Sequence, residues 1–360
     1  MLHPDTWEVT RPVDGVPTLM VLVDTEEGFD WSQPLARANT DVTAMRAQAR
    51  AHRIFDKFGI KPVYVADFPV ASQKDGFAPL RELLDDDRCV VGAHLHPWVN
   101  PPFEEAVCNA NSYPGNLPGA LEREKLRRLT DTIGENLGRR PVVYKAGRYG
   151  AGFNTSASLA ALGYEIDTSV LARTNLSAEE GPDFSRCVSS PYWFGRDRRL
   201  LEIPMTVGYV GALGRGGPAL RGLLSSGTGL ALHLPGIFSR LGLFERIVLT
   251  PEGISSDEHR RLTRAMLAAG QRVFSFTYHS PSLAPGNTPY VQSESELVVF
   301  LDKFERYFDF FFGEIGGRAA TPLEIKALVA RDPRSRESNA AVGRNGNRRD
   351  VARPISHRVS

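Results

Sequence analysis

Short apolar runs alternate along the chain with longer amphipathic segments, and this alternation predicts an α/β fold. The run at residues 18–23 is apolar after its first residue, as expected of a strand buried on both faces. Similar runs predict strands at residues 62–66, 89–91, 141–145, 165–170, 200–207, 247–250 and 273–278. Amphipathic segments predict helices at residues 42–58, 78–86, 121–137, 154–162, 257–269 and 293–312. About seven or eight strands that alternate with helices favour a barrel of parallel β/α units, complete or partial, over an open sheet.

The chain is long enough to bury a sizeable core, with 360 residues of which 42% are hydrophobic. We expect a single domain over residues 1–330. After about residue 331, arginine, glycine, asparagine and serine dominate and large apolar residues almost vanish. This change in composition predicts a disordered, arginine-rich tail over residues 331–360.

Charge, cysteine content and the lack of long apolar runs limit the partners and the cellular location that we expect for the protein. A net charge of +1 gives no electrostatic case for a nucleic-acid partner, and three cysteines in so long a chain form no disulfide framework. The N-terminal residues include Asp5 and Glu8 and lack the apolar segment of a signal peptide. No apolar run reaches the roughly 18 residues of a membrane span. We therefore expect a cytoplasmic protein without a membrane span.

One connection is unusually long for a compact domain. Residues 97–119 are rich in proline, asparagine and glycine and contain no periodic apolar pattern. Loops of this length are often walls or lids of functional sites, so we expect this segment to border a site.

Acidic, basic and imidazole side chains follow the predicted strands at their carboxyl ends. They are Asp24, Glu26, His94, His96, Arg148, Asp167 and His279. In a β/α barrel these strand ends carry the catalytic residues, so we expect the side chains to gather at one mouth of the barrel. Because residues i and i+2 of a strand point to the same side, the imidazoles of His94 and His96 can converge on one point.

Two histidines and a carboxylate commonly bind a divalent metal ion with an open coordination position. Such an ion polarises a carbonyl group and lowers the pKa of bound water. A further carboxylate could accept a proton from that water, and a further histidine could donate one to a leaving group. Oxygen and imidazole ligands admit Zn²⁺, our first expectation, and also Co²⁺, Ni²⁺ or Mn²⁺.

Five segments in order resemble the motifs of the polysaccharide deacetylase (NodB-homology, carbohydrate esterase) superfamily. They are VLVDTEEGFDW, VGAHLHPW, YKAGRYG, YEIDTSV and FTYHSPSL, within residues 17–312. The Asp-Thr-Glu-Glu and His-x-His motifs are similar to those of one branch of it. The resemblance implies a partial or distorted (β/α)7–8 barrel of the glycoside hydrolase/deacetylase type. It also implies a hydrolase of non-peptide carbon–nitrogen bonds, which removes an N-acetyl or related acyl group from a saccharide or small amide.

The resemblance also implies roles for individual residues. Asp24 would be the general base, His279 the general acid, and His94 and His96 metal ligands. Arg148 would orient the base, and Asp167 would hold the arginine. The usual first motif has two adjacent aspartates, whereas Thr25 follows Asp24 here. We therefore expect Glu26 to be the third ligand, because it shares a side of the strand with Asp24 and has the longer side chain.

Two alternatives remain open. An allantoinase-like relative would hydrolyse a non-sugar carbon–nitrogen bond with the same fold and metal. A catalytically silent barrel would keep the fold as a binding protein. The altered first motif and the spacing of two residues between His94 and His96, where the family has four, motivate this second alternative.

Overall fold

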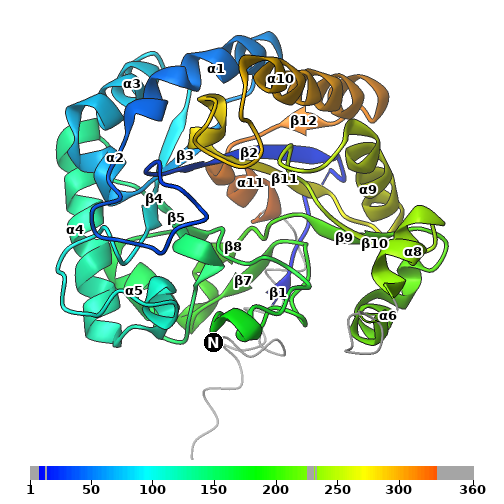
Figure 1. Ribbon diagram of the computed structural model, residues 1–360, viewed down its shortest axis with the longest axis horizontal. Coiled ribbons are helices and arrows are strands. Elements are labelled where there is room, and N and C mark those ends of the chain that lie inside the picture. Colours follow the sequence, from blue (N-terminus) through cyan, green and yellow to red (C-terminus); the bar gives the residue numbers. More distant parts are fainter. Residues whose placement is uncertain (1–7, 13, 225–230, 232, 331–360) are drawn as a thin grey trace, which may run out of the picture.

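The computed structural model describes residues 8–12, 14–224, 231 and 233–330 of the chain. Its centre is a curled sheet of parallel strands. They are β2 (Thr18–Thr25), β3 (Val63–Ala66), β4 (Val90–Leu95), β5 (Val143–Ala146), β6 (Ile166–Asp167), β8 (Leu200–Glu202) and β11 (Val273–His279). The order β8-β6-β5-β4-β3-β2-β11 places sequence neighbours side by side and brings β11 back to β2 (Figure 1).

Helices surround the strands on the outside of the curled sheet (Figure 1). They are α1 (Gln48–Lys57), α2 (Phe68–Ser72), α3 (Lys74–Asp85), α4 (Gly119–Leu137), α5 (Thr155–Leu162), α9 (Ser256–Ala268) and α10 (Glu294–Phe308). Local sequence sets their ends: Asp67 accepts a hydrogen bond from the amide of Val70 and caps α2, and Gly138 ends α4 at φ 69°. The six predicted helices are confirmed, with shifts at their ends.

Successive residues of the central strands face opposite sides of the sheet. In β2, Leu19 and Val21 belong to the larger hydrophobic cluster, which lies between the strands and the surrounding helices. Met20 and Leu22 belong to a second cluster on the inner face. A helix that the sequence pattern did not reveal, α11 (Pro322–Val329), adds apolar side chains to this inner cluster. The inside of the barrel is therefore a packed core, as the fold class requires.

The barrel is incomplete, because no ladder of backbone hydrogen bonds joins β8 to β11 among the described residues. The gap is bridged by single bonds: the amide of Ser275 donates to the hydroxyl of Thr206 at 2.8 Å, and the Ser275 hydroxyl donates to the carbonyl of Pro204 at 2.9 Å. The amide of Thr277 donates to the carbonyl of Leu249 at 3.2 Å. The prediction of a partial or distorted (β/α)7–8 barrel is confirmed.

Several strand predictions need correction. The predicted strand 200–207 is split around Pro204 into β8 and β9 (Val207–Val210), because proline has no amide hydrogen for a ladder. The strand predicted at 247–250 is β10 (Glu245–Val248), which pairs antiparallel with β9 outside the main sheet. Short strands at the edges were not predicted: β1 (Glu8–Val9) and β7 (Tyr192–Phe194) are antiparallel, and β12 (Arg318–Ala319) is parallel to β2.

The glycine- and serine-rich stretch at residues 211–229, which the sequence predicts to be irregular, contains helix α6 (Gly217–Leu224), and helix α8 (Leu234–Arg240) follows it before β10. The predicted tail at 331–360 lies outside the described residues. No helix in the described part of the chain has the length and apolar character to cross a membrane. The expectation of a cytoplasmic location stays a prediction.

Candidate active site

The inner face of the sheet supplies the candidate site at the carboxyl ends of the strands. In steps of two residues, Asp24 follows Leu22 onto this face and Lys145 follows Val143. His94 in β4, His96 directly after β4 and His279 of β11 lie on the same face by the same rule. They border a cavity of about 700 Å³. Its lining includes Asp24, Glu26, Trp31, His94, His96, Trp98, Asn109, Tyr113, Lys145, Arg148, Tyr149, Glu179, His279 and Tyr290.

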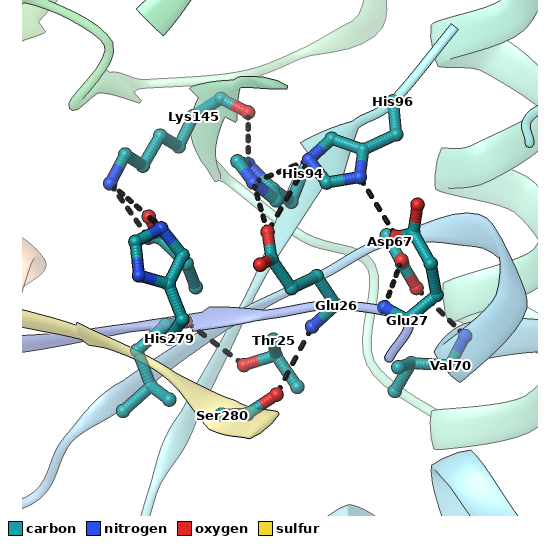
Figure 2. Close-up of polar contacts among 12 residues, drawn as sticks. Thr25, Glu26, Glu27, Asp67, Val70, His94, His96, Lys145, His279 and Ser280 are labelled. Atoms are coloured by element: carbon teal, nitrogen blue, oxygen red, sulfur yellow. Dashed lines mark hydrogen bonds and ion pairs between the residues drawn. The ribbon is translucent and has the colours of Figure 1, made fainter. Parts of the chain in front are cut away.

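Three buried side chains converge at one end of the cavity (Figure 2). The Nε2 atoms of His94 and His96 lie 3.0 Å apart. An oxygen of Glu26 lies 3.6 Å from Nε2 of His94 and 3.5 Å from Nε2 of His96. The structure thus brings the three predicted metal ligands together. Gly147 makes room for this cluster, because a β-carbon there would lie 2.5 Å from Cδ2 of His96.

Hydrogen bonds on the far side of each ring determine which nitrogen faces the cluster. Nδ1 of His94 lies 3.0 Å from the carbonyl oxygen of Lys145, which can only accept, so Nδ1 carries the hydrogen. Burial lowers the pKa of His94 and of His96 to about 4, so both rings are neutral. The Nε2 of His94 therefore offers a lone pair to the centre of the cluster.

The second ring is held by an acid that the sequence analysis had not singled out. Nδ1 of His96 lies 2.9 Å from Oε2 of Glu27, and Trp98 donates its indole hydrogen to Oε1 at 2.9 Å. The amide of Glu27 donates to Asp67 at 2.7 Å. Glu27 is completely buried, and burial raises its pKa to about 8. A carboxylate behind a ligating histidine fixes the ring orientation and strengthens the ligand.

The donor set fits a divalent metal ion. Two imidazole nitrogens and one carboxylate, all facing one point, form the arrangement that leaves coordination positions open for water and substrate. Burial raises the pKa of Glu26 to about 7, and the nearby carboxyl groups of Asp24 and Asp67 act in the same direction, against the lowering effect of His279 and His96. A bound cation would reverse this effect.

Asp24 lies beside the cluster and is paired with a lysine. Nζ of Lys145 donates to both carboxylate oxygens, at 2.7 and 2.6 Å, and both side chains are buried. Burial alone would raise the pKa of Asp24, but the charges of Lys145 and His279 and the hydrogen bonds from Lys145 outweigh burial and lower it. Asp24 is therefore ionised at neutral pH.

His279 completes this side of the cavity. Its Nε2 lies 3.6 Å from an oxygen of Asp24, and its Nδ1 lies 2.7 Å from Oε2 of Glu252. Glu252 also accepts the backbone amide of His279 at 3.1 Å and the hydroxyl of Ser282 at 2.6 Å. Burial opposes the charged ring, but Glu252, Glu26 and Asp24 raise the pKa of His279 to about 10. The ring is therefore a cation that can donate a proton.

The expected contacts of Arg148 are wrong. Its hydrogen bonds go to Asn109 at 2.7 Å, Ser112 at 2.5 Å and Glu179 at 3.4 Å, rather than to Asp24. The cause is local: residue 148 has φ 53° and ψ 28°, a left-handed turn that carries the side chain along the cavity wall. Lys145, rather than Arg148, lies beside Asp24.

Asp167 does not hold the arginine either. Ile166 belongs to the inner cluster, so Asp167 faces the outer side of the sheet. There its Oδ1 accepts hydrogen bonds from the amide of Ser169 at 3.0 Å and from the Ser169 hydroxyl. A small separate cavity of about 30 Å³ lies beside it and Glu202.

The loop at 97–119 borders the cavity, as predicted. A buried lysine organises its first part: Nζ of Lys125 donates to the carbonyls of Pro97, Asn100 and Pro102 at 3.0, 2.6 and 2.7 Å. Glu105 pairs with the same ammonium group at 3.1 Å. The ammonium group of Lys125 on α4 thus satisfies backbone carbonyl groups of this loop that have no partner in a helix or strand.

No protein-family model matches the chain, and neither does any curated protein. Similar solved structures include a protein from Mycobacterium smegmatis assigned as a polysaccharide deacetylase, with 16% identity, a TM-score of 0.47, and coverage of 99% of this chain and 100% of that one. Chitin deacetylase from Colletotrichum lindemuthianum shares 12% identity, with a TM-score of 0.38 and coverage of 91% and 92%. A CE4-family pseudoenzyme from Bacillus anthracis shares 9% identity, with a TM-score of 0.39 and coverage of 88% and 66%. The sequence motifs resemble this superfamily, but likenesses this distant carry no conclusion about the activity of this chain.

Proposed function

We propose that this protein is a metal-dependent hydrolase that removes an acetyl or related acyl group from nitrogen on a saccharide or another small amide. The observation that carries the proposal is the convergence of Glu26, His94 and His96 beside the Asp24 and His279 pair in one cavity. A divalent ion held by these three residues, with Zn²⁺ as the first candidate, would supply Lewis-acid polarisation of the acyl carbonyl and acidify a water molecule.

The residues beside the three proposed metal ligands carry out the proton transfers. Asp24 accepts a proton from the attacking water, and Lys145 fixes both carboxylate oxygens and keeps them ionised. His279 donates its Nε2 proton to the departing nitrogen as the carbon–nitrogen bond breaks. Glu252 holds the opposite ring nitrogen and stabilises the imidazolium. The products are the free amine and the carboxylic acid.

Metal content and acyl release test the proposal together. We expect near-stoichiometric metal in the wild type and its loss from the His94→Ala/His96→Ala double variant. Asp24→Asn keeps the shape of the side chain and should keep the metal, while turnover on a panel of N-acetyl sugars falls at least about 100-fold. Turnover that survives in metal-loaded Asp24→Asn would exclude this mechanism.

The panel also separates the alternatives. Hydrolysis of cyclic ureides such as allantoin, with no release of acetate from N-acetyl sugars, would favour the allantoinase-like reaction. A wild type that takes up no metal after supplementation with divalent ions would favour a catalytically silent binding protein.

A further inference from the structure

Arg148 has no part in the proton transfers proposed above, yet it lines the same cavity. It follows β5 at φ 53°, and Tyr149 follows at φ 59°. Two successive side-chain-bearing residues in the left-handed region are unfavourable, and such strain collects at ligand-binding sites. The chain accepts this strain where the turn brings Arg148 and Tyr149 to the cavity wall.

Neutral groups hold the guanidinium of Arg148 in place. The group lies over the ring of Tyr113, with 4.4 Å between its central carbon and the ring centroid. Nη1 donates both of its hydrogens, to Oδ1 of Asn109 at 2.7 Å and to the hydroxyl of Ser112 at 2.5 Å. These contacts fix the plane and direction of the guanidinium without neutralising its charge.

Among the described residues, a single weak contact balances the charge of Arg148. Oε2 of Glu179 lies 3.4 Å from Nη2, and the Glu179 side chain is 64% exposed, so water screens this pair. Within the described part of the chain, Nε–H and the second hydrogen on Nη2 have no hydrogen-bond partner. Together these two nitrogens form the edge that binds a carboxylate or a phosphate with two parallel hydrogen bonds.

We propose that Arg148 binds an anionic group of the substrate, so that the site selects N-acyl compounds that carry a carboxylate or a phosphate. The substrate anion would displace Glu179 from Nη2. The cavity has room for a substituted sugar, and Trp31, Trp98, Tyr149 and Tyr290 provide aromatic surface along its walls. This inference names the substrate class of the function proposed above and rests on it.

Paired ligands test the inference by binding, without requiring turnover. Calorimetry on the Zn²⁺-supplemented protein would compare neutral N-acetylglucosamine with N-acetylglucosamine 6-phosphate and N-acetylmuramic acid. We expect at least one anionic member to bind roughly 10- to 100-fold more tightly, with a preference that shrinks as salt is added. Arg148→Gln should abolish this preference, and Arg148→Lys should keep only part of it. Glu179→Gln removes the competing carboxylate and should enlarge it.

Arg46→Gln is the matched control, because Arg46 is an exposed arginine paired with an acid outside the cavity. It should keep the preference. The inference is overturned if all three ligands bind alike or not at all, or if Arg148→Gln weakens neutral and anionic ligands equally, as a purely structural arginine would. Acyl release on the same ligands keeps the two proposals apart. Arg148-dependent anion binding without acyl release contradicts the proposed function alone, and acyl release without charge preference contradicts the inference alone.

Discussion

Two groups of histidines share the cavity, and their pKa values move in opposite directions. His94 and His96 have pKa values near 4, whereas the pKa of His279 is near 10. All three rings lose solvent, which favours the neutral form in each. What differs is the group behind the ring: His94 faces a backbone carbonyl, while His279 faces Glu252 and has Asp24 on its other side.

The comparison indicates how one residue type could supply both the proposed metal ligands and the proposed acid. A neutral acceptor fixes the tautomer of His94 without stabilising a second proton, which leaves a lone pair for a cation. Carboxylates on both sides of His279 hold that second proton, which leaves a donor for the leaving group. Both the partner behind the ring and the smaller burial of His279, whose side chain is 23% exposed, separate the two groups. His96 also has an acid behind it, but burial raises the pKa of Glu27 to about 8 and keeps that acid protonated at pH 7.

Removal of the partner of His279 should have the largest effect. In Glu252→Gln the ring loses its strongest stabilising charge, so we expect its pKa to fall by more than one unit. Because the proposed mechanism needs the imidazolium, activity should be lost as pH rises through this pKa, and the alkaline limb should move to lower pH. At pH values above the wild-type pKa, turnover should therefore fall more than about tenfold, while turnover at pH 7 should change little. NMR titration of the ring and a pH–rate profile measure both effects, with exposed Glu294→Gln as the control.

Removal of the charge behind His96 should have a smaller effect, on metal affinity rather than on protons. We expect Glu27→Gln to weaken metal binding by roughly 10- to 100-fold, because a bound cation favours the ionised form of Glu27 behind the ring, which glutamine cannot supply. Competition with a chromophoric chelator measures this without any assay of turnover. Trp98→Phe removes one donor to the same carboxylate and should change the affinity less. Unchanged affinity in Glu27→Gln would show that Glu27 only fills space.

The smallest effect concerns an acid outside the cavity. Burial raises the pKa of Asp167 to about 6, above its ordinary value, so the unfolded chain gives up this proton at lower pH than the folded one. The free energy of unfolding therefore falls as pH rises from about 4 to about 6 and stays lower above that. Asp167→Asn should raise it by about 1–3 kcal/mol at pH 7.5 and change little at pH 4.

Chemical denaturation at the two pH values measures this difference. Metal content and turnover should stay unchanged in Asp167→Asn, because the side chain faces the outer side of the sheet. A loss of turnover in Asp167→Asn without a loss of stability would indicate that Asp167 does have a role in catalysis.

Much of the candidate site could be predicted from the alternation of side chains between the two faces of each strand. Asp24, His94, His96 and His279 end long or strongly apolar strands, where steps of two residues fix the inner face. The same rule could have found Lys145, two residues after the inward-facing Val143. To apply the rule to Lys145, one must know which residues of that strand face inward, and a short apolar run does not reveal this.

Three other features depend on contacts distant in sequence or on backbone conformation. Glu252 follows a weak strand signal, and its importance comes from His279, 27 residues further along the chain. A left-handed turn directs Arg148 away from Asp24, and a sequence without glycine at that position rarely predicts such a turn. Asp167 lies in a strand shorter than its apolar run suggests, and its neighbour Ile166 takes the inner position.

The gap between β8 and β11 has a consequence for how the molecule opens. On one side β11 is joined to β2 by a full parallel ladder, and on the other by the scattered bonds of Ser275 and Thr277. Opening the barrel between β8 and β11 should therefore cost less free energy than opening it between two strands joined by a ladder of backbone hydrogen bonds. Hydrogen exchange should begin there, at the amides of Ser275 and Thr277. The strand that carries His279, the proposed proton donor, is thus also the edge at which we expect local unfolding to admit solvent to the core first.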